Sequence, residues 1–448
     1  MSLYLYELPT TGAISFSDFC TDSAERLYTN HISDTTQARA NLRAALKESK
    51  RTHDGEKDYL KLVKILEEYL PRLRGILACV ASGQIQLKAE PTFSWRTTLS
   101  ANLFNTSPRL SLPSLDADYA YSLLTYAFAL SNLARAKISS LGTYEHDRAI
   151  SDADRKAKDS QLTVAADLLC RTSGIFSYIS ETVLGDWEST SSFASSAFTK
   201  PPDLSREVNS ALAKSSLADA QTLAIRKLLS KSAYDSNVTP GPPLPKSHPS
   251  PALISKLHLE CASLYSSART LAKTPSSAGK GKPKGTSADG EVSADLRRYL
   301  HDETVFHDAL ARKWLGVDAG ENGGADRGGD AVGFLIWAKK ELEELKGRKK
   351  DRVSDELETV NVFLKHYKKV NDSLHFQPVP TQADLQSRIP TGRLALSAKT
   401  YVPPQPAFGP GSLEDIRRKA EELEVDDDDS VEDMNKTQGS YAGAGSYF

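Results

Sequence analysis

The sequence has little sulfur and no long apolar run, and each absence excludes a class of protein. Its 448 residues include four cysteines and two methionines. The cysteines are far apart, at positions 20, 79, 170 and 261, so we expect reduced thiols and neither a disulfide framework nor a zinc site. The longest apolar-leaning stretch, YAYSLLTYAFALSNLA, is interrupted by polar residues and is too short to span a bilayer.

Neither sign of charge is in excess. The chain has 56 basic and 58 acidic side chains, for a formal net charge of −2. Nucleic acids and anionic membranes both require a basic surface, so the overall charge gives no reason to expect either partner. The first residues, MSLYLYELPTTG, lack the basic start and apolar core of a signal peptide. We therefore expect a cytoplasmic protein that reaches membranes only indirectly, through partners or a local surface.

Helical periodicity dominates the first 372 residues, whereas strand signals are sparse. The main strand-like stretch is SGQIQLKAEPTFSW at 82–95. Long helices joined by short loops favour one extended helical solenoid, although no repeat of fixed period is visible. The predicted helices cover 34–51, 56–83, 116–142, 145–184, 203–232, 251–272, 290–314, 331–348 and 350–372.

Three segments have the composition of unstructured chain. Gly, Ser, Pro and Lys dominate 274–290, and Gly and Asp dominate 318–330. From 401 to 448 the chain is rich in proline, then acidic, then small and polar. Within this tail a short helix is predicted over 412–424, because Ser412 and Asp415 approximate a capping box before a thin apolar stripe. We expect a helical domain over residues 1 to 400, followed by a largely disordered tail.

No pattern in the sequence indicates catalysis, a cofactor or a metal. GKGKPKGT lacks the spacing of a P-loop, and no strand precedes it. DAGENGGADRGG has glycines where a calcium loop needs oxygen ligands. Glu303 and His307 share a helical face, which more often marks a surface pair than two metal ligands. We therefore expect a non-enzymatic protein, while a site assembled from distant segments stays open.

The helices on either side of the proline-rich stretch TPGPPLPKSHPSP are the most informative. In SPALISKLHLECASLYSSA the apolar arc turns Ile254 toward the core and leaves Leu253 and Leu257 along its edge. The preceding helix carries a stripe of alanines and leucines that includes Leu228, extended to one side by Ile225. Two such helices either pack fully into the core or leave a shallow groove lined by these side chains. A partner helix would place its apolar face in that groove.

These segments resemble the BRO1 domain family. LADAQTLAIRKLL followed by PALISKLHLECASLYSSA resembles the paired helices of that family, and LHFQPVP stands where the family has a motif ending in Val-Pro. The ending TYVPPQPAFGPGS…YAGAGSYF is similar to fungal members that act in alkaline-pH (Pal/Rim) signalling. The resemblance covers residues 1 to 400. It implies a mainly α, boomerang-shaped domain with a tetratricopeptide-like solenoid core, to which the sequence adds a small β element near the N-terminal third.

The resemblance also implies a partner. BRO1 domains receive the C-terminal helix of a Snf7/Vps32-type ESCRT-III subunit on a convex apolar patch, which by motif position falls on Leu253 and Leu257. Ala224 stands where relatives have an aromatic residue, so the patch is shallower here unless Ile225 or Leu228 compensates.

Two functions follow from these features. The fungal members imply an adaptor that links ESCRT-III, at endosomal or plasma-membrane sites, to a calpain-like signalling protease. The alternative is a general helical scaffold that acts mainly through its tail. Binding of Tyr-Pro-x-Leu peptides is not expected, because the sequence ends without the helical arms that bind them in larger BRO1 proteins.

Overall fold

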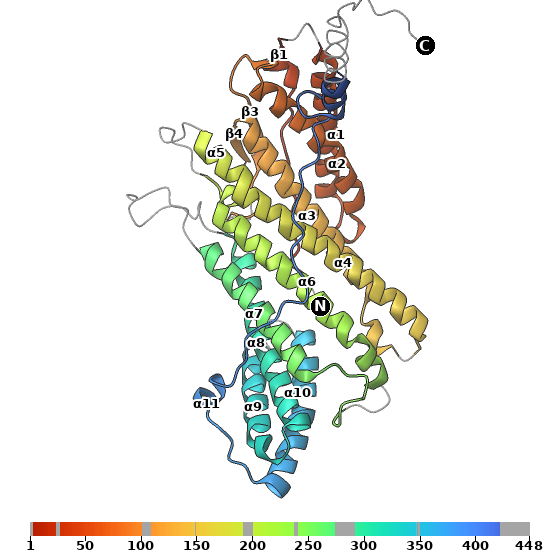
Figure 1. Ribbon diagram of the computed structural model, residues 1–448, viewed down its shortest axis with the longest axis vertical. Helices are drawn as coiled ribbons and strands as arrows, with labels where there is room; N and C mark the ends of the chain where they lie inside the picture. Colours follow the sequence, from red (N-terminus) through yellow and green to blue (C-terminus); the bar gives the residue numbers. More distant parts are fainter. Residues whose placement is uncertain are drawn as a thin grey trace, which may run out of the picture.

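In the computed structural model, the chain is an elongated stack of helices (Figure 1). The structure describes residues 3–23, 27–100, 109–147, 149–190, 200–236, 241–273, 292–345, 347 and 350–421. The helices are α1 (Thr29–Arg51), α2 (Tyr59–Ala81), α3 (Leu115–Leu141), α4 (Asp152–Tyr178), α5 (Leu184–Thr190), α6 (Arg206–Ser236), α7 (Pro251–Lys273), α8 (Ala294–Asn322), α9 (Gly328–Leu345), α10 (Lys350–Val370) and α11 (Gln382–Gln386).

The long helices pack mainly against their neighbours in the chain. α3 lies on α4, α4 on α6, α6 on α7, and so on to α10, which is the order of a helical solenoid. The mainly α, solenoid-like prediction is therefore confirmed. Within the described ranges no helix is both long enough and apolar enough to cross a membrane.

Side-chain caps determine where several helices begin. The side chain of Asp58 accepts a hydrogen bond from the amide of Lys61 at the start of α2, and Ser293 caps α8 in the same way. Ser151 caps α4, which explains why this helix begins at Asp152 and not at 145 as predicted. A π-helical turn, Ile179–Val183, then joins α4 to α5, so the predicted end at 184 falls where α5 begins.

Two small antiparallel sheets lie in the N-terminal third. β2 (Ile85–Leu87) pairs with β1 (Cys20–Asp22), and β3 (Thr92–Arg96) pairs with β4 (Arg109–Pro113). β2 and β3 fall in the predicted strand-like stretch, which confirms the small β element. β1 and β4 were not predicted, because each is short and stands apart from the one long strand-like stretch, which contains both β2 and β3.

A buried ion pair joins α1 to α3. Arg39 Nη2 lies 2.8 Å from Asp118 Oδ1, and the two side chains are 2% and 0% exposed. The Asp118 carboxylate also accepts hydrogen bonds from Tyr69 OH at 2.8 Å and from Trp95 Nε1 at 2.7 Å. Because Tyr69 lies in α2 and Trp95 in β3, this carboxylate connects four elements of the N-terminal half.

The predicted unstructured insert at 318–330 is wrong. α8 continues to Asn322, and α9 begins after a single 3₁₀ turn. The glycines in this stretch permit close packing: a Cβ at Gly320 would lie 2.5 Å from Tyr367 Cε1 of α10. Their abundance therefore reflects contact between helices and not disorder. The other predicted insert, 274–290, lies outside the described residues.

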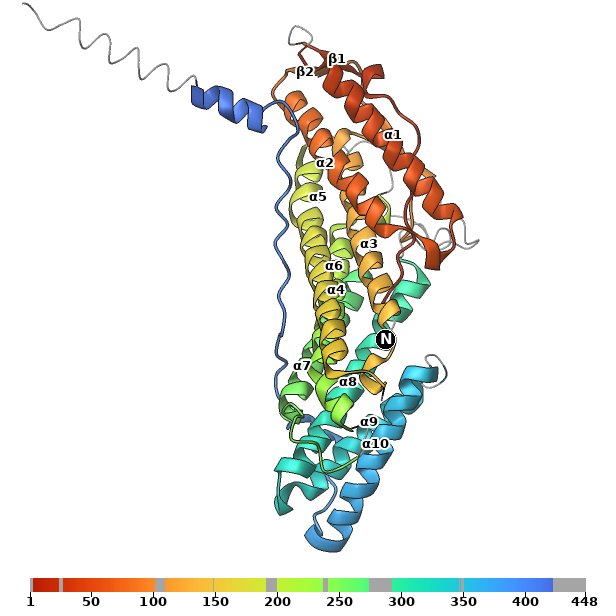
Figure 2. The same ribbon diagram turned by 90° about the vertical axis from the view of Figure 1, so that its right-hand side faces the viewer.

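After α11 the chain runs back along the body to α1 and α2 as an extended segment (Figures 1 and 2). We call residues 390–411 the strap. Its backbone is hydrogen-bonded to the body at intervals: Lys399 N donates to Cys170 O of α4 at 3.0 Å, and Ala407 N donates to Pro71 O of α2 at 2.9 Å. These two contacts hold the strap on α2 and α4, which both lie in the N-terminal half of the chain.

The strap ends in a buried aromatic anchor. Phe408 is 2% exposed and stacks on His31 of α1, with ring centroids 4.5 Å apart. A Cβ at Gly75 of α2 would lie 2.7 Å from Phe408 Cε1, so only glycine leaves room for the ring. The predicted boundary at residue 400 is therefore wrong, because 401–411 packs as part of the domain.

A helix follows the anchor at residues 413–421, inside the predicted range 412–424. Ser412 Oγ accepts a hydrogen bond from Asp415 N at 3.2 Å, and Asp415 Oδ2 accepts one from Gly411 N at 2.9 Å, so the predicted cap is formed. The acidic segment and the remainder of the tail, 422–448, lie outside the described residues.

Candidate partner-binding surface

α6 and α7 pack antiparallel, and their contacts show which residues lie at the same level. Thr222 Oγ1 is 3.9 Å from Cys261 Sγ. Because both helices rise equally per residue, Leu228, six residues after Thr222, lies at the level of Ser255, six residues before Cys261. Leu253 is in the same turn of α7. Leu228 and Leu253 therefore lie at a similar level of the two helices, and the groove between them stays a prediction.

Three of the five predicted site residues reach the surface. Leu228 is 37% exposed, and Ala224 and Leu253 are half-buried. Leu253 packs on the core with one side of its chain. We call Ala224, Leu228 and Leu253 the α6–α7 patch.

The other two predicted site residues belong to the core. Leu257 is 4% exposed and Ile225 is 3% exposed, so the expectation that Leu257 lies at the edge is wrong. The reason is that α7 packs against both α6 and α8, and its buried arc is wider than that of a helix covered on one side. A partner cannot contact Leu257 or Ile225 without repacking the core.

The strap crosses α6 and α7 beside the patch. The Gln221 side chain of α6 donates to Leu396 O at 2.7 Å and accepts from Leu396 N at 3.2 Å. On α7, Lys256 O accepts from Arg393 N at 3.0 Å. Both contacts lie about one helical turn from a patch residue. The strap therefore forms one border of the patch.

Sequence analysis missed this border. The two residues of the Gln221–Leu396 contact are 175 positions apart, and no local pattern relates them. The available signal was Gln221 itself, a polar side chain among the alanines and leucines of its helix. A buried side-chain amide needs several hydrogen-bond partners, and here a passing backbone supplies them.

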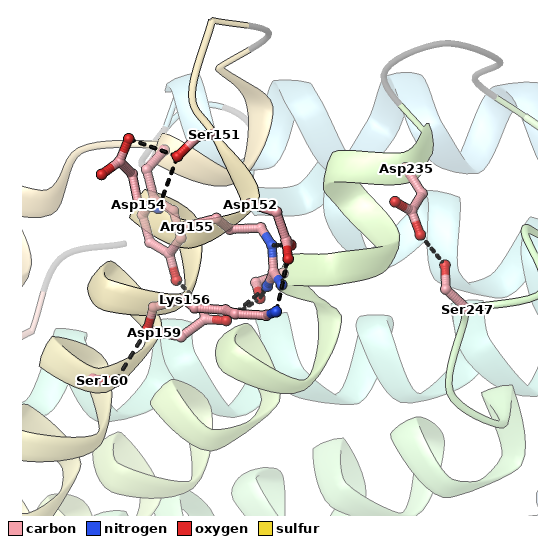
Figure 3. Close-up of polar contacts among 11 residues, drawn as sticks. Ser151, Asp152, Asp154, Arg155, Lys156, Asp159, Ser160, Asp235 and Ser247 are labelled. Atoms are coloured by element: carbon pink, nitrogen blue, oxygen red, sulfur yellow. Dashed lines mark hydrogen bonds and ion pairs between the residues drawn. The ribbon is translucent and has the colours of Figure 1, made fainter.

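The end of α6 next to the patch is fixed on α4 (Figure 3). Arg155 Nη1 donates to Asp159 Oδ2 at 2.7 Å and to Ser230 Oγ of α6 at 2.9 Å. Further along, the Ser247 hydroxyl donates to Asp235, which ties the connection before α7 to the last turn of α6. These bonds hold the last turns of α6, which carry Leu228, against α4 and the connection before α7.

A buried histidine pair lies behind the patch. His258 Nδ1 of α7 is 2.8 Å from His307 Nδ1 of α8, so one ring donates to the other and they cannot both be protonated at these atoms. Thr222 Oγ1 lies 3.2 Å from His307 Nε2. Glu303 Oε2 lies 3.8 Å from His307 Nε2, so the predicted i,i+4 pair is formed, but both side chains are buried and the pair does not lie at the surface. Glu303 also pairs with Arg352 at 3.0 Å.

No metal site emerges from these histidines. In the part of the chain that the structure describes, no group of three or more His, Cys, Asp or Glu side chains could hold an ion. The four cysteines are free and buried, and burial raises the pKa of the Cys79 and Cys170 thiols to about 11.

The histidine pair predicts a dependence of stability on pH. Burial, and then the neighbouring His307, lower the pKa of His258 well below its usual range. In the unfolded chain a histidine takes up a proton below a pH of about 6.5, which the folded state resists, so stability falls as the pH falls. The loss approaches about 1.4 kcal/mol per pH unit for this group.

Urea unfolding between pH 7.5 and 5.5 tests this dependence. Below pH 6.5, H258Q is expected to lose stability less steeply than the wild-type protein, whatever its stability at pH 7.5. Equal slopes for the two proteins would show that His258 does not titrate as inferred.

Known proteins resemble this chain in sequence and in fold. The family model of the BRO1-like domain matches residues 15–415. Over 499 residues the chain is 36% identical to the pH-response regulator protein palC of Cryptococcus neoformans var. neoformans serotype D (strain B-3501A), with 100% of both chains covered. It is 25% identical to the protein of the same name from Yarrowia lipolytica (strain CLIB 122 / E 150), with 99% of each covered.

Two solved structures share the fold. In one, ALIX is in complex with the SIVmac239 PYKEVTEDL late domain; the TM-score is 0.62 at 18% identity, over 90% of this chain and 50% of that one. The chain thus spans half the length of that ALIX chain. The other is the complex of ALIX BRO1 with CHMP4C, with a TM-score of 0.58 at 18% identity over 90% and 96% of the two chains.

Proposed function

Because the chain belongs to the family of BRO1-like domains, we propose that it is a non-enzymatic adaptor of fungal alkaline-pH signalling. In this role the α6–α7 patch binds the C-terminal helix of a Snf7/Vps32-type ESCRT-III subunit. Two observations support the role: full-length relatives are named pH-response regulators, and a BRO1 domain of the same fold has been solved with CHMP4C.

The observation that carries the proposal is the pair of surface leucines on α6 and α7. Leu228 and Leu253 lie at a similar level of two packed helices, where the apolar face of a partner helix covers both. Lys231 and Lys256 stand three positions after Leu228 and Leu253, and Arg393 bonds to the backbone of Lys256; these three have no ion-pair partner among the described residues. They outnumber the carboxylate of Glu260, which lies beside Gly392. These charges favour a partner helix whose polar face is acidic.

The adaptor then works by placing two partners together. The chain is cytoplasmic, is recruited to endosomal or plasma-membrane sites where ESCRT-III assembles, and brings a calpain-like signalling protease to them. Ala224 in place of a larger side chain makes the interface small, which suits an association that follows ambient pH and is reversible.

Substitution of the surface leucines tests the patch. L228D and L253D are each expected to weaken binding to a peptide of the Snf7-type C-terminal helix by about 10- to 100-fold. This corresponds to the roughly 1.5–3 kcal/mol gained when a leucine is buried. Isothermal titration gives the affinity, and circular dichroism shows whether the helices remain. The matched control is V164D, because Val164 is 50% exposed on α4 and outside the patch.

The scaffold alternative rests on the helix at 413–421, whose Leu413 and Ile416 are 60% and 48% exposed. Deleting 413–448 removes that helix and keeps the Phe408 anchor, so the strap stays in place. The adaptor proposal predicts that this truncated protein binds the peptide with wild-type affinity. Loss of binding on truncation, with L228D and L253D unaffected, would favour the tail.

A further inference from the structure

The turn after α10 forms one end of the molecule, opposite the end that carries α1 (Figures 1 and 2). α10 continues into a π-helical turn, Asn371–His375, and the chain then reverses toward α11. Phe376, at the reversal, has φ 54° and ψ 28°, in the left-handed region that residues other than glycine seldom adopt. We call residues 371–380 the α10 turn.

Three large apolar side chains of this turn face solvent. Leu374 is 70% exposed, Phe376 is 74% exposed and Val379 is 48% exposed. Single exposed apolar residues are ordinary on protein surfaces, but three within six positions at a protruding end form a patch. Water is a poor environment for such a patch, so it indicates a contact surface.

The fold fixes this turn without covering it. Asn371 is buried, and its side chain donates to Gln377 O at 2.9 Å and accepts from Gln377 N at 3.2 Å. On the other side the turn presses on the start of α9, where Gly328 leaves room: a Cβ there would lie 2.5 Å from Asn371 Oδ1. The apolar side chains are therefore presented on a rigid backbone and are not the result of a loose loop.

The charges beside the turn are mainly positive. Lys365, Lys368 and Lys369 lie exposed on the last two turns of α10, and none has an ion-pair partner among the described residues. Three exposed acidic side chains near them are likewise without an ion pair there. Asp326 and Asp372 lie near the turn, whereas Glu358 lies on α10 two helical turns before Lys365 and farther from the turn. Although the chain as a whole is close to neutral, this end presents apolar side chains next to an excess of lysine.

We propose that the α10 turn is a membrane-contact site for anionic phospholipid. Phe376, Leu374 and Val379 enter the boundary between headgroups and acyl chains, which favours aromatic and aliphatic side chains. The lysines lie beside them, where the negative surface potential of an anionic leaflet attracts them. This contact goes beyond the proposed adaptor function, because it places the protein on lipid directly and not only through ESCRT-III.

A fluorophore at the turn tests insertion directly. The four native cysteines are all buried, so an introduced exposed cysteine reacts selectively with a thiol label. We label L374C with an environment-sensitive dye and add vesicles of phosphatidylcholine and phosphatidylserine in a 70:30 ratio. The expected result is a blue shift with a rise in intensity, weaker at high salt and much weaker with pure phosphatidylcholine. V402C is the control, because Val402 is 79% exposed on the strap.

Vesicle flotation with unlabelled protein gives the second measurement. The double variant L374S/F376N is expected to lower the bound fraction at least tenfold, and asparagine accepts the left-handed backbone at 376. K368E/K369E is expected to abolish the preference for anionic vesicles, while V402S binds like the wild type. The proposal is overturned if the wild-type protein does not bind anionic vesicles. It is also overturned if L374S/F376N binds them as well as the wild type does. If the wild-type protein does not bind vesicles, and L374S/F376N no longer binds a protein ligand that the wild type binds, the turn is a contact site for a protein partner instead.

Discussion

Replacing Arg39 with methionine is expected to lower the free energy of unfolding by about 3–5 kcal/mol, the usual cost of removing one partner of a buried ion pair. The Asp118 carboxylate would remain 0% exposed, with hydrogen bonds from Tyr69 and Trp95 but without a positive charge beside it. Because this carboxylate connects α1, α2, α3 and β3, the loss should affect the whole N-terminal half.

The measurement is urea unfolding followed by circular dichroism. K61M is the matched control: the Lys61–Glu48 pair has a similar length, 3.0 Å, but its side chains are 54% and 65% exposed. Exposed pairs contribute at most about 1 kcal/mol. A shift in R39M no larger than that in K61M would show that the buried pair does not stabilise the fold as inferred.

Replacing Phe408 with alanine is expected to release the end of the strap. The ring is almost fully buried between α1 and α2, and a phenylalanine-to-alanine change at such a site costs about 3–5 kcal/mol. The cost falls mainly on the docking of the strap, because the helices beneath it are held by their own neighbours.

Hydrogen exchange reports this release. The amide of Ala407, which donates to Pro71 O, is expected to exchange roughly a hundredfold faster or more in F408A. Amides in the middle of α3 should keep their protection. V402A serves as the control, since Val402 is largely exposed and its truncation should change stability by less than about 0.5 kcal/mol. Unchanged exchange at Ala407 in F408A would mean that other contacts hold the strap.

The helices were predictable because their signals are local. Periodic apolar residues lie within one element, and they placed most boundaries within a few residues. Strand β1 was not predictable in this way, because its partner β2 lies about 65 positions away and β1 itself has three residues. The glycines at 318–330 were misread for a related reason: composition does not distinguish a flexible linker from a tight contact between helices.

The candidate site was predictable in part. The two helices follow from periodicity and from the resemblance. The burial of Leu257 does not follow from periodicity, because a helical wheel describes one helix and does not show how many neighbouring helices cover it. The border formed by the strap depends on Gln221 and on a segment some 175 positions later, a relation that only the folded chain reveals.

The strap also determines the order in which the molecule is completed. Each long helix packs against neighbours in the chain, so the body can assemble progressively as it leaves the ribosome. The contact between Arg74 and Pro404 spans 330 positions and must wait until nearly all of the domain has been synthesised. Until then the slot between α1 and α2 that takes Phe408 is open, and the nascent domain presents an apolar cleft that the mature protein does not.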